Sequence, residues 1–247
     1  MSTFRYTRPG NFPPVVKNLI IINVLVWVAQ LVFNSSFDLT SKLALYPIDS
    51  PQFEPYQIAT HMFAHAAVAG TGENTVPVLS HIFFNMFNLW FFGRMLENVW
   101  GPKRFLLFYL VCGVGAAAFH LLVQHLQYDP ELVRQFEVAR MMGRTEDAME
   151  ILSRIRFGNP AVGASGAVMG LIAGAALLFP NTQLMMLFIP FPIKLKWLAL
   201  VMIALDLFGG FNPYIRSGIA HFAHLGGAIT GFILIIIWNK TNRKSLY

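Results

Sequence analysis

Charged side chains are scarce in this sequence. Of its 247 residues only 12% are Asp, Glu, Lys or Arg, whereas 55% are hydrophobic, and the mean hydropathy is +0.54. Soluble domains are about one-quarter charged, so this chain carries about half the charge that a soluble domain of its size would have. The scarcity excludes a disordered chain, argues against an ordinary soluble enzyme and predicts a protein that crosses a membrane several times.

The sequence also lacks a second cysteine, a signal-peptide cleavage site and a patch of basic residues. Cys112 is the single cysteine, so no internal disulfide can form, and its apolar surroundings favour a buried small residue. No small-residue cleavage site follows the first apolar run, which is therefore expected to be retained as a span and not removed as a signal peptide. The net charge is +6, but the bases are dispersed beside apolar runs and form no patch, which argues against nucleic acid as a partner.

Long apolar runs are what the sequence has in abundance. The runs that are long enough to cross about 30 Å of hydrocarbon predict an all-α membrane protein with six transmembrane helices. They form one unit over residues 17–238, with short tails at 1–16 and 239–247 and long polar connections at 34–80 and 127–162. The predicted spans are residues 17–33, 81–97, 104–126, 163–188, 195–208 and 219–238.

The distribution of charge predicts the orientation of these spans. If the N-terminus is cytoplasmic, the cytoplasmic side receives eleven bases and one acid, Glu97, while the opposite side receives seven bases and ten acids. Cytoplasmic loops of membrane proteins are enriched in Lys and Arg. We therefore expect both tails to be cytoplasmic and the two long loops to face outward.

The second long loop has a helical pattern of its own. Apolar residues alternate with charges before and after Gly143, and Thr145 is followed by acids, as at the start of a helix. The loop is expected to form an amphipathic helical pair. The pair could lie on the outer membrane interface or pack as an extramembrane hairpin, and the sequence does not decide between these arrangements.

Polar groups inside a span are costly, so each one indicates a functional site. In the predicted topology, the second, fourth and sixth spans begin on the same side, which places Ser165, His224, Asn85 and His81 at a similar depth. A serine becomes nucleophilic when an imidazole accepts its proton, and nearby donors can stabilise an oxyanion. The motifs that contain these residues are Gly163-Ala164-Ser165-Gly166, His221-Phe222-Ala223-His224 and His81-Ile82-Phe83-Phe84-Asn85.

Glycines explain how the serine and the histidine could meet. Gly163 and Gly166 flank Ser165 and permit a sharp entry and a close helix contact. Gly227 and Gly231 form a small-residue face on the sixth span, and Gly166 begins a matching series, with a spacing of four, on the fourth. Packing of these two faces is expected to bring the two polar residues together.

Each of these signals also has a purely structural explanation. A lone Gly-x-Ser-Gly motif in a membrane helix more often serves packing than catalysis, and His81 and Asn85 could simply satisfy each other or a loop backbone. His61 and His65 are four residues apart and would share a helix face, so they could bind a metal. No His-Glu-x-x-His motif accompanies them, and structural hydrogen bonding is favoured.

Taken together, the motifs resemble those of the rhomboid family of intramembrane serine proteases. The similarity covers most of the chain from about residue 56 to residue 235. It implies a six-helix rhomboid-type bundle with a water-filled cavity that is open to the outer side. The matching stretches are 61–65, 81–85, 105–110, 163–166 and 223–231.

The resemblance also implies roles for individual residues. Ser165 would be the nucleophile and His224 the general base of a Ser–His dyad that needs no aspartate, with no metal or cofactor. Asn85 and His81, with the backbone N–H of Ser165, would form the oxyanion hole, and Phe84 would lie beside the route of the substrate. The substrates implied are single-span membrane proteins, cut within their transmembrane segment in the lipid bilayer.

A substrate helix must enter such a site sideways, so part of the bundle has to yield. The short fifth span, which contains Asp206 and runs into Gly209 and Gly210, is the candidate gate, although these glycines could also form only a turn.

The expected location is a bacterial cytoplasmic membrane. The competing interpretations are a catalytically silent rhomboid-like protein that binds or escorts membrane proteins, a metalloprotease built on His61 and His65, and a transporter.

Overall fold

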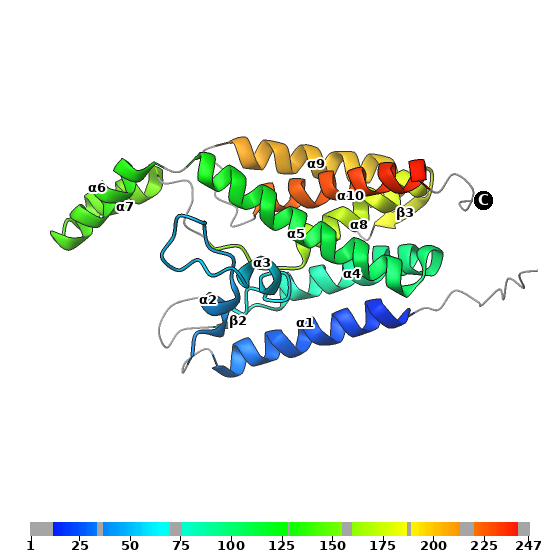
Figure 1. Cartoon of the computed structure of the whole chain (residues 1–247), viewed down its shortest axis with the longest axis horizontal. Coiled ribbons are helices and arrows are strands. Elements are labelled where there is room, and N and C mark those ends of the chain that lie inside the picture. The colour runs from blue at the N-terminus through cyan, green and yellow to red at the C-terminus, as the bar shows by residue number, and fades with distance from the viewer. Residues whose placement is uncertain are drawn as a thin grey trace, which may run out of the picture.

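The chain folds into a bundle of helices (Figure 1). The computed structural model describes residues 12–33, 37–69, 76–127, 129–154, 160–186, 189–212 and 220–241. In these residues the longer helices each overlap one predicted span. They are α1 (Pro14–Phe33), α4 (Leu79–Trp100), α5 (Pro102–Leu126), α8 (Ser165–Leu178), α9 (Leu195–Phe211) and α10 (His221–Thr241).

Three of the described helices are long and apolar enough to cross a membrane. They are α1, α5 and the stretch His221–Asn239 of α10, whereas α8 is apolar but has only 14 residues. Large apolar side chains are exposed along α1, α4, α9 and α10, where a soluble protein would carry polar groups. The chain is therefore a helical membrane protein, and the count of six spans stays a prediction.

Short elements connect the long helices. The loop between α1 and α4 contains α2 (Leu39–Leu43), α3 (Gln57–Thr60) and the antiparallel pair β1 (Val68–Ala69) and β2 (Val76–Pro77). An isolated bridge between Leu45 and Ala161 ties this loop to the segment that precedes α8. The loop is thereby held close to the start of α8.

The prediction that the fourth span extends over residues 163–188 is wrong beyond residue 178. The helix α8 ends at Leu178, because Phe179 leaves the helical conformation and Pro180 cannot continue it. The strands β3 (Gln183–Met186) and β4 (Ile189–Lys194) then form an antiparallel pair in which Gln183 lies opposite Lys194. Apolar composition alone did not distinguish this hairpin from a continued helix.

The centre of the bundle is α8. Every residue from Gly166 to Ala176 is buried, because α10, α5 and α4 all pack around this helix. On its outer sides α1 packs against α4, and α9 packs against α10 and α8. Figure 1 shows α9 and α1 on opposite faces of the bundle.

Glycines set the closest of these contacts. A Cβ atom on Gly227 would lie 1.8 Å from the carbonyl oxygen of Gly166, and one on Gly231 would lie 2.7 Å from that of Gly170. The backbones of α10 and α8 therefore touch along the face that the glycine spacing indicates. On the next side of α8, a Cβ atom on Gly170 would lie 2.5 Å from Cys112 Sγ on α5.

Glu97, the one acid expected on the basic side, has a structural role. Its carboxylate is buried and accepts hydrogen bonds from the backbone N–H groups of Val15 and Val16, at 3.0 and 2.8 Å. These N–H groups lie in the first turn of α1, where they have no acceptor within their own helix. A carboxylate is also favoured there by the helix dipole. Glu97 thus joins the end of α4 to the start of α1.

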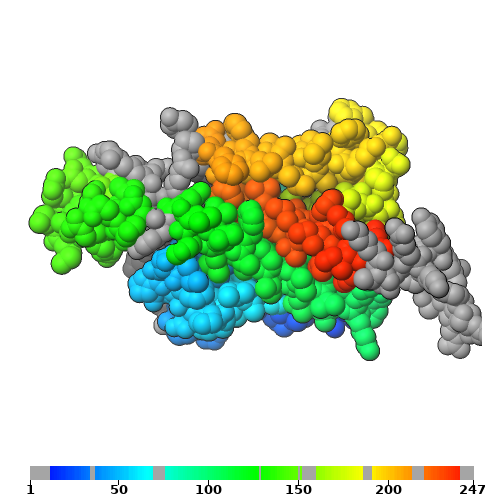
Figure 2. All heavy atoms as spheres, turned by 45° about the horizontal axis from the view of Figure 1, so that its top comes forward, coloured from blue at the N-terminus to red at the C-terminus, as the bar shows by residue number. Residues whose placement is uncertain are grey.

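The helical pair predicted in the second long loop is present. It consists of α6 (Pro130–Met141) and α7 (Thr145–Arg154), which pack on each other, with Asp129 capping α6 and Gly143 turning the chain at φ +67°. The pair stands clear of the bundle at one end (Figure 2). The two helices thus pack on each other as a hairpin, and whether the pair also lies on the outer membrane interface stays a prediction.

Candidate active site

A serine and a histidine from different helices meet near one end of the bundle. Ser165 is the first residue of α8 and His224 lies in the first turn of α10, 59 residues later. Ser165 Oγ lies 2.8 Å from His224 Nε2, and both side chains are partly buried. The glycine contact explains this position, since Gly166 follows Ser165 directly and Gly227 lies three residues after His224.

Gly163 leaves space next to the serine. Its φ of +127° is one that residues with a side chain rarely adopt. A Cβ atom at this position would lie 2.9 Å from His81 Nε2 and 3.6 Å from Ser165 Oγ. The backbone N–H of Gly163 donates to the carbonyl of His61 at 2.9 Å, which holds the segment in place. The absence of a side chain therefore opens a small space between the imidazole of His81 and the hydroxyl of Ser165.

His81 is oriented as a donor toward that space. Its Nδ1 accepts a hydrogen bond from the backbone N–H of Ala66 at 3.0 Å, so the neutral ring carries its proton on Nε2. The same Nε2 is the atom closest to the position that a Gly163 side chain would take. The N–H groups of the first turn of α8, which starts at Ser165, also have no acceptor within their helix. The Nε2–H of His81 thus lies beside this space, next to the start of α8.

Asn85 lies one turn after His81 and is buried. Its Nδ2 donates to the backbone carbonyl of His81 at 2.9 Å, and its Oδ1 has no hydrogen-bond partner among the described residues. One N–H of the amide remains after that bond, because an amide nitrogen carries two hydrogens. The role of Asn85 in an oxyanion hole stays a prediction.

Asp206 belongs to this site, which the sequence did not indicate. It lies on α9, 18 residues before His224, and its Oδ1 and Oδ2 lie 3.0 and 3.2 Å from His224 Nδ1. Its Oδ1 also lies 2.7 Å from Nδ1 of His221. The intramembrane position of Asp206 was a signal of function, but nothing in the sequence linked it to a particular histidine. The side chains of Ser165, His224 and Asp206 therefore form a continuous hydrogen-bonded series.

The expectation that His61 and His65 share a helix face is wrong. The helix α3 ends at Thr60, so His65 lies in the loop beyond it. His61 Nδ1 lies 2.9 Å from the carbonyl of Gln57, and the backbone N–H and C=O of His65 both bond to the Gln30 side chain. No group of three or more possible metal ligands occurs among the described residues.

The His65 imidazole packs against the site without reaching Ser165. Its ring centroid lies 5.2 Å from that of His81, in an edge-on arrangement. Burial, together with the neighbouring His81, lowers the pKa of His65 to about 3. His65 therefore stays neutral at physiological pH and adds no positive charge next to His81.

The residues expected at a gate lie on two different helices, Phe84 on α4 and the two glycines on α9. Phe84 is 60% exposed on α4, and its ring packs edge-on against Phe83. Gly209 and Gly210 lie inside α9, although they were expected in a flexible segment after it. A Cβ atom on Gly209 would lie 2.5 Å from the ring of His221, and one on Gly210 would lie 3.1 Å from Phe222. These glycines thus allow close packing of α9 on α10, and the gate stays a prediction.

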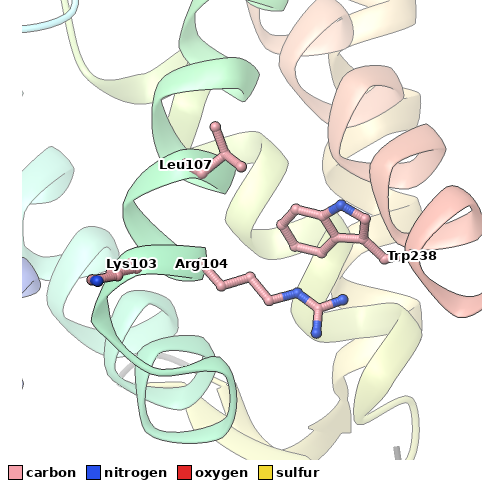
Figure 3. A pocket seen from close by; sticks show the side chains of 4 residues that line it. All are labelled: Lys103, Arg104, Leu107 and Trp238. Atoms are coloured by element: carbon pink, nitrogen blue, oxygen red, sulfur yellow. The ribbon is translucent and has the colours of Figure 1, made fainter. Parts of the chain in front are cut away.

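A hollow of about 360 Å³ lies elsewhere on the bundle (Figure 3). It is lined by Lys103, Arg104, Leu107 and Trp238, and the guanidinium of Arg104 lies 4.3 Å from the ring centroid of Trp238. Trp238 is 14 residues after His224 on α10, a rise of about 21 Å along the helix. Basic and aromatic side chains at helix ends are typical of a membrane interface. This hollow is separate from the serine and histidine.

Comparison with known proteins gives one consistent result. A family model described as "Rhomboid domain" matches residues 52–240. The chain is 27% identical over 231 residues to "Rhomboid protease AarA" of Providencia stuartii, an alignment of 89% of this chain and 70% of that protein. It is 28% identical to "RHOMBOID-like protein 12, mitochondrial" of Arabidopsis thaliana, over 93% of this chain and 59% of that protein. It is 28% identical to human "Presenilin-associated rhomboid-like protein, mitochondrial", over 68% of this chain and 38% of that protein.

Proposed function

The chain belongs to the rhomboid family, and from this we propose that it is a serine endopeptidase that cleaves membrane proteins within their transmembrane segments. The observation that carries the proposal is the 2.8 Å distance between Ser165 Oγ and His224 Nε2. A hydroxyl at this distance from an imidazole can transfer its proton as it attacks a carbonyl carbon. The chain spans about 60–70% of the length of the first two relatives. That it shares the activity of a complete relative is therefore proposed and not shown.

In the proposed reaction Ser165 attacks the scissile carbonyl and His224 takes its proton on Nε2. The carbonyl oxygen becomes an oxyanion in the space that Gly163 leaves open, where His81 Nε2–H and the first N–H groups of α8 are available as donors. His224 then protonates the leaving amine, and the acyl-enzyme is hydrolysed by water with His224 again as base. Each step uses a group that lies beside Ser165.

A catalytically silent rhomboid-like protein is the main alternative. The relatives carry both protease and rhomboid-like names, so the family by itself does not decide the activity. The intact hydrogen bond between the serine and the histidine favours the protease. We further propose, from the charge distribution, that both tails are cytoplasmic. The bacterial cytoplasmic membrane is proposed as the location of the protein. Matching relatives occur in mitochondria as well as in bacteria.

Active-site labelling tests the proposal without knowledge of the substrate. The full chain is reconstituted in liposomes and treated with a fluorophosphonate, which reacts with serines activated by a base. We expect labelling of the wild-type protein and of Ser80→Ala, an exposed serine of α4, but not of Ser165→Ala. A panel of tagged single-span proteins in the same liposomes then tests for cleavage. Labelling that persists in Ser165→Ala, or cleavage that a chelator abolishes, would contradict the serine mechanism.

Asn85→Ala is expected to lower kcat by about 10²–10³ if the remaining N–H of the amide binds the oxyanion. The substitution also removes the hydrogen bond to the carbonyl of His81, so a thermal unfolding curve is needed beside the kinetics. Asn88→Ala is the matched control, since Asn88 makes the same type of bond to the carbonyl of Phe84 on an exposed part of α4. Equal losses in the two variants would remove Asn85 from the proposed oxyanion hole.

A further inference from the structure

Asp206 presents a buried carboxylate to the histidine that faces Ser165. A carboxylate only accepts hydrogen bonds, so at the observed distances both His221 and His224 direct an Nδ1–H toward it. For His224 this leaves Nε2 without a proton in the neutral ring. The nitrogen that lies 2.8 Å from Ser165 Oγ is therefore the one with the free lone pair.

We propose that Asp206 is a positioning residue that keeps His224 in the tautomer needed by a general base. An imidazole with its proton on Nε2 would donate to the hydroxyl of Ser165 and could not take its proton. The resemblance implied a dyad without an acid, whereas this geometry provides a third residue from α9. The inference rests on the proposed proteolytic function and adds to it the means by which the base is held.

The carboxylate of Asp206 has a second effect, which follows from the path of the proton during the reaction. As the bond between Ser165 Oγ and the carbonyl carbon forms, the hydroxyl proton moves to Nε2 and His224 becomes an imidazolium. As the carbon–nitrogen bond breaks, that proton moves on to the leaving amine, while the Nδ1 proton stays between His224 and Asp206 throughout. The negative charge of Asp206 stabilises the imidazolium during this interval.

The surroundings of His224 make this charge important. Two further imidazoles, His81 on α4 and His120 on α5, interact electrostatically with His224, and His221 lies on its own helix. None of these supplies a negative charge. Asp206, held at 3.0 Å, is the acid that bonds to His224 among the described residues.

His221 and Gly209 hold the carboxylate in place. His221 Nδ1 makes the shorter bond to Asp206, at 2.7 Å, and its ring packs on the backbone of α9 at Gly209, three residues after Asp206. A side chain on Gly209 would displace that ring. The absence of a Cβ atom thus lets α9 approach α10 closely enough for one carboxylate to reach both histidines.

The test compares Asp206→Asn with the wild-type protein in liposomes. The amide is close in shape to the carboxylate, but its nitrogen donates and favours the wrong tautomer of His224. We expect kcat for a single-span substrate to fall on the order of 10³–10⁴-fold, with KM and the unfolding temperature little changed. Asp206→Glu, which retains the charge, should recover part of the loss. Asp49→Asn is the matched control, because Asp49 bonds to Nδ1 of His125 at 2.9 Å on an exposed part of the chain.

A second measurement does not depend on activity or on any variant at Asp206. In ¹⁵N-histidine-labelled full-length protein in lipid nanodiscs, the His224 signals, assigned by their loss in His224→Ala, should show a proton on Nδ1. A proton on Nε2 in the wild-type protein, or a wild-type kcat in Asp206→Asn, would overturn the proposal. Failure of the wild-type protein to cleave or to be labelled at Ser165 would instead overturn the protease function, and the NMR result would still decide the tautomer.

Discussion

Replacement of Ser165 by Ala is expected to lower the rate of membrane-protein cleavage by at least about 10⁴-fold. The substitution removes the one oxygen that lies 2.8 Å from His224 Nε2, so no acyl-enzyme can form. The fold should be unchanged, because Ser165 is only partly buried and its hydroxyl bonds to no side chain or backbone group other than His224 among the described residues. The measurement is the first-order cleavage rate in liposomes, with circular dichroism and thermal unfolding as evidence of folding.

His224→Ala is expected to cause a loss of similar size, because the serine and its base act as one unit. The double variant should then be little slower than either single variant, since groups that act together are strongly non-additive. Ser80→Ala serves as the control for serine removal from a membrane helix. If the two losses multiplied instead, the residues would act independently and the proposed proton transfer between them would be wrong.

Among variants that add one methyl group to the bundle, Gly227→Ala is expected to lose the most stability. The new Cβ atom would lie 1.8 Å from the carbonyl oxygen of Gly166, and a backbone atom of a buried helix cannot move aside as a side chain can. The helices α8 and α10 must separate, which we expect to cost about 3 kcal/mol, at the upper end of overpacking effects. Because Ser165 precedes Gly166, the same separation should also increase the distance to His224 and reduce activity.

A series of Gly→Ala variants tests this reasoning. Gly231→Ala should be less harmful, because its Cβ atom would lie 2.7 Å from the carbonyl of Gly170. Gly174→Ala is the matched control, since its nearest neighbours, at 3.1 Å, are the side-chain tips of Ile235 and Phe108. Thermal unfolding in detergent should therefore rank the variants as Gly227, Gly231 and Gly174, from most to least destabilised. A loss for Gly174→Ala as large as that for Gly227→Ala would contradict the role of the backbone contact.

Much of this protein follows from the sequence because the physical cause is local. Few charges and long apolar runs predict helices that cross the hydrocarbon of a membrane. Helices of the structure overlap each predicted span. The pattern around Gly143 predicts a helical pair, since capping residues and amphipathic spacing act within a few residues. The spacing of Gly227 and Gly231 indicates a face for close packing, because residues four apart lie on one side of a helix.

Other features were decided only by the tertiary structure, because they depend on groups far apart in the chain. The boundary of the fourth helix at Leu178 was missed, since an apolar β-hairpin and an apolar helix have similar compositions. Gly209 was expected after the fifth span but lies inside α9, where the ring of His221 from another helix occupies the space that a side chain on Gly209 would need. Asp206 shows the same limit. Its sequence position marks a costly buried charge, while only the packing of α9 against α10 brings that charge within 3.0 Å of His224.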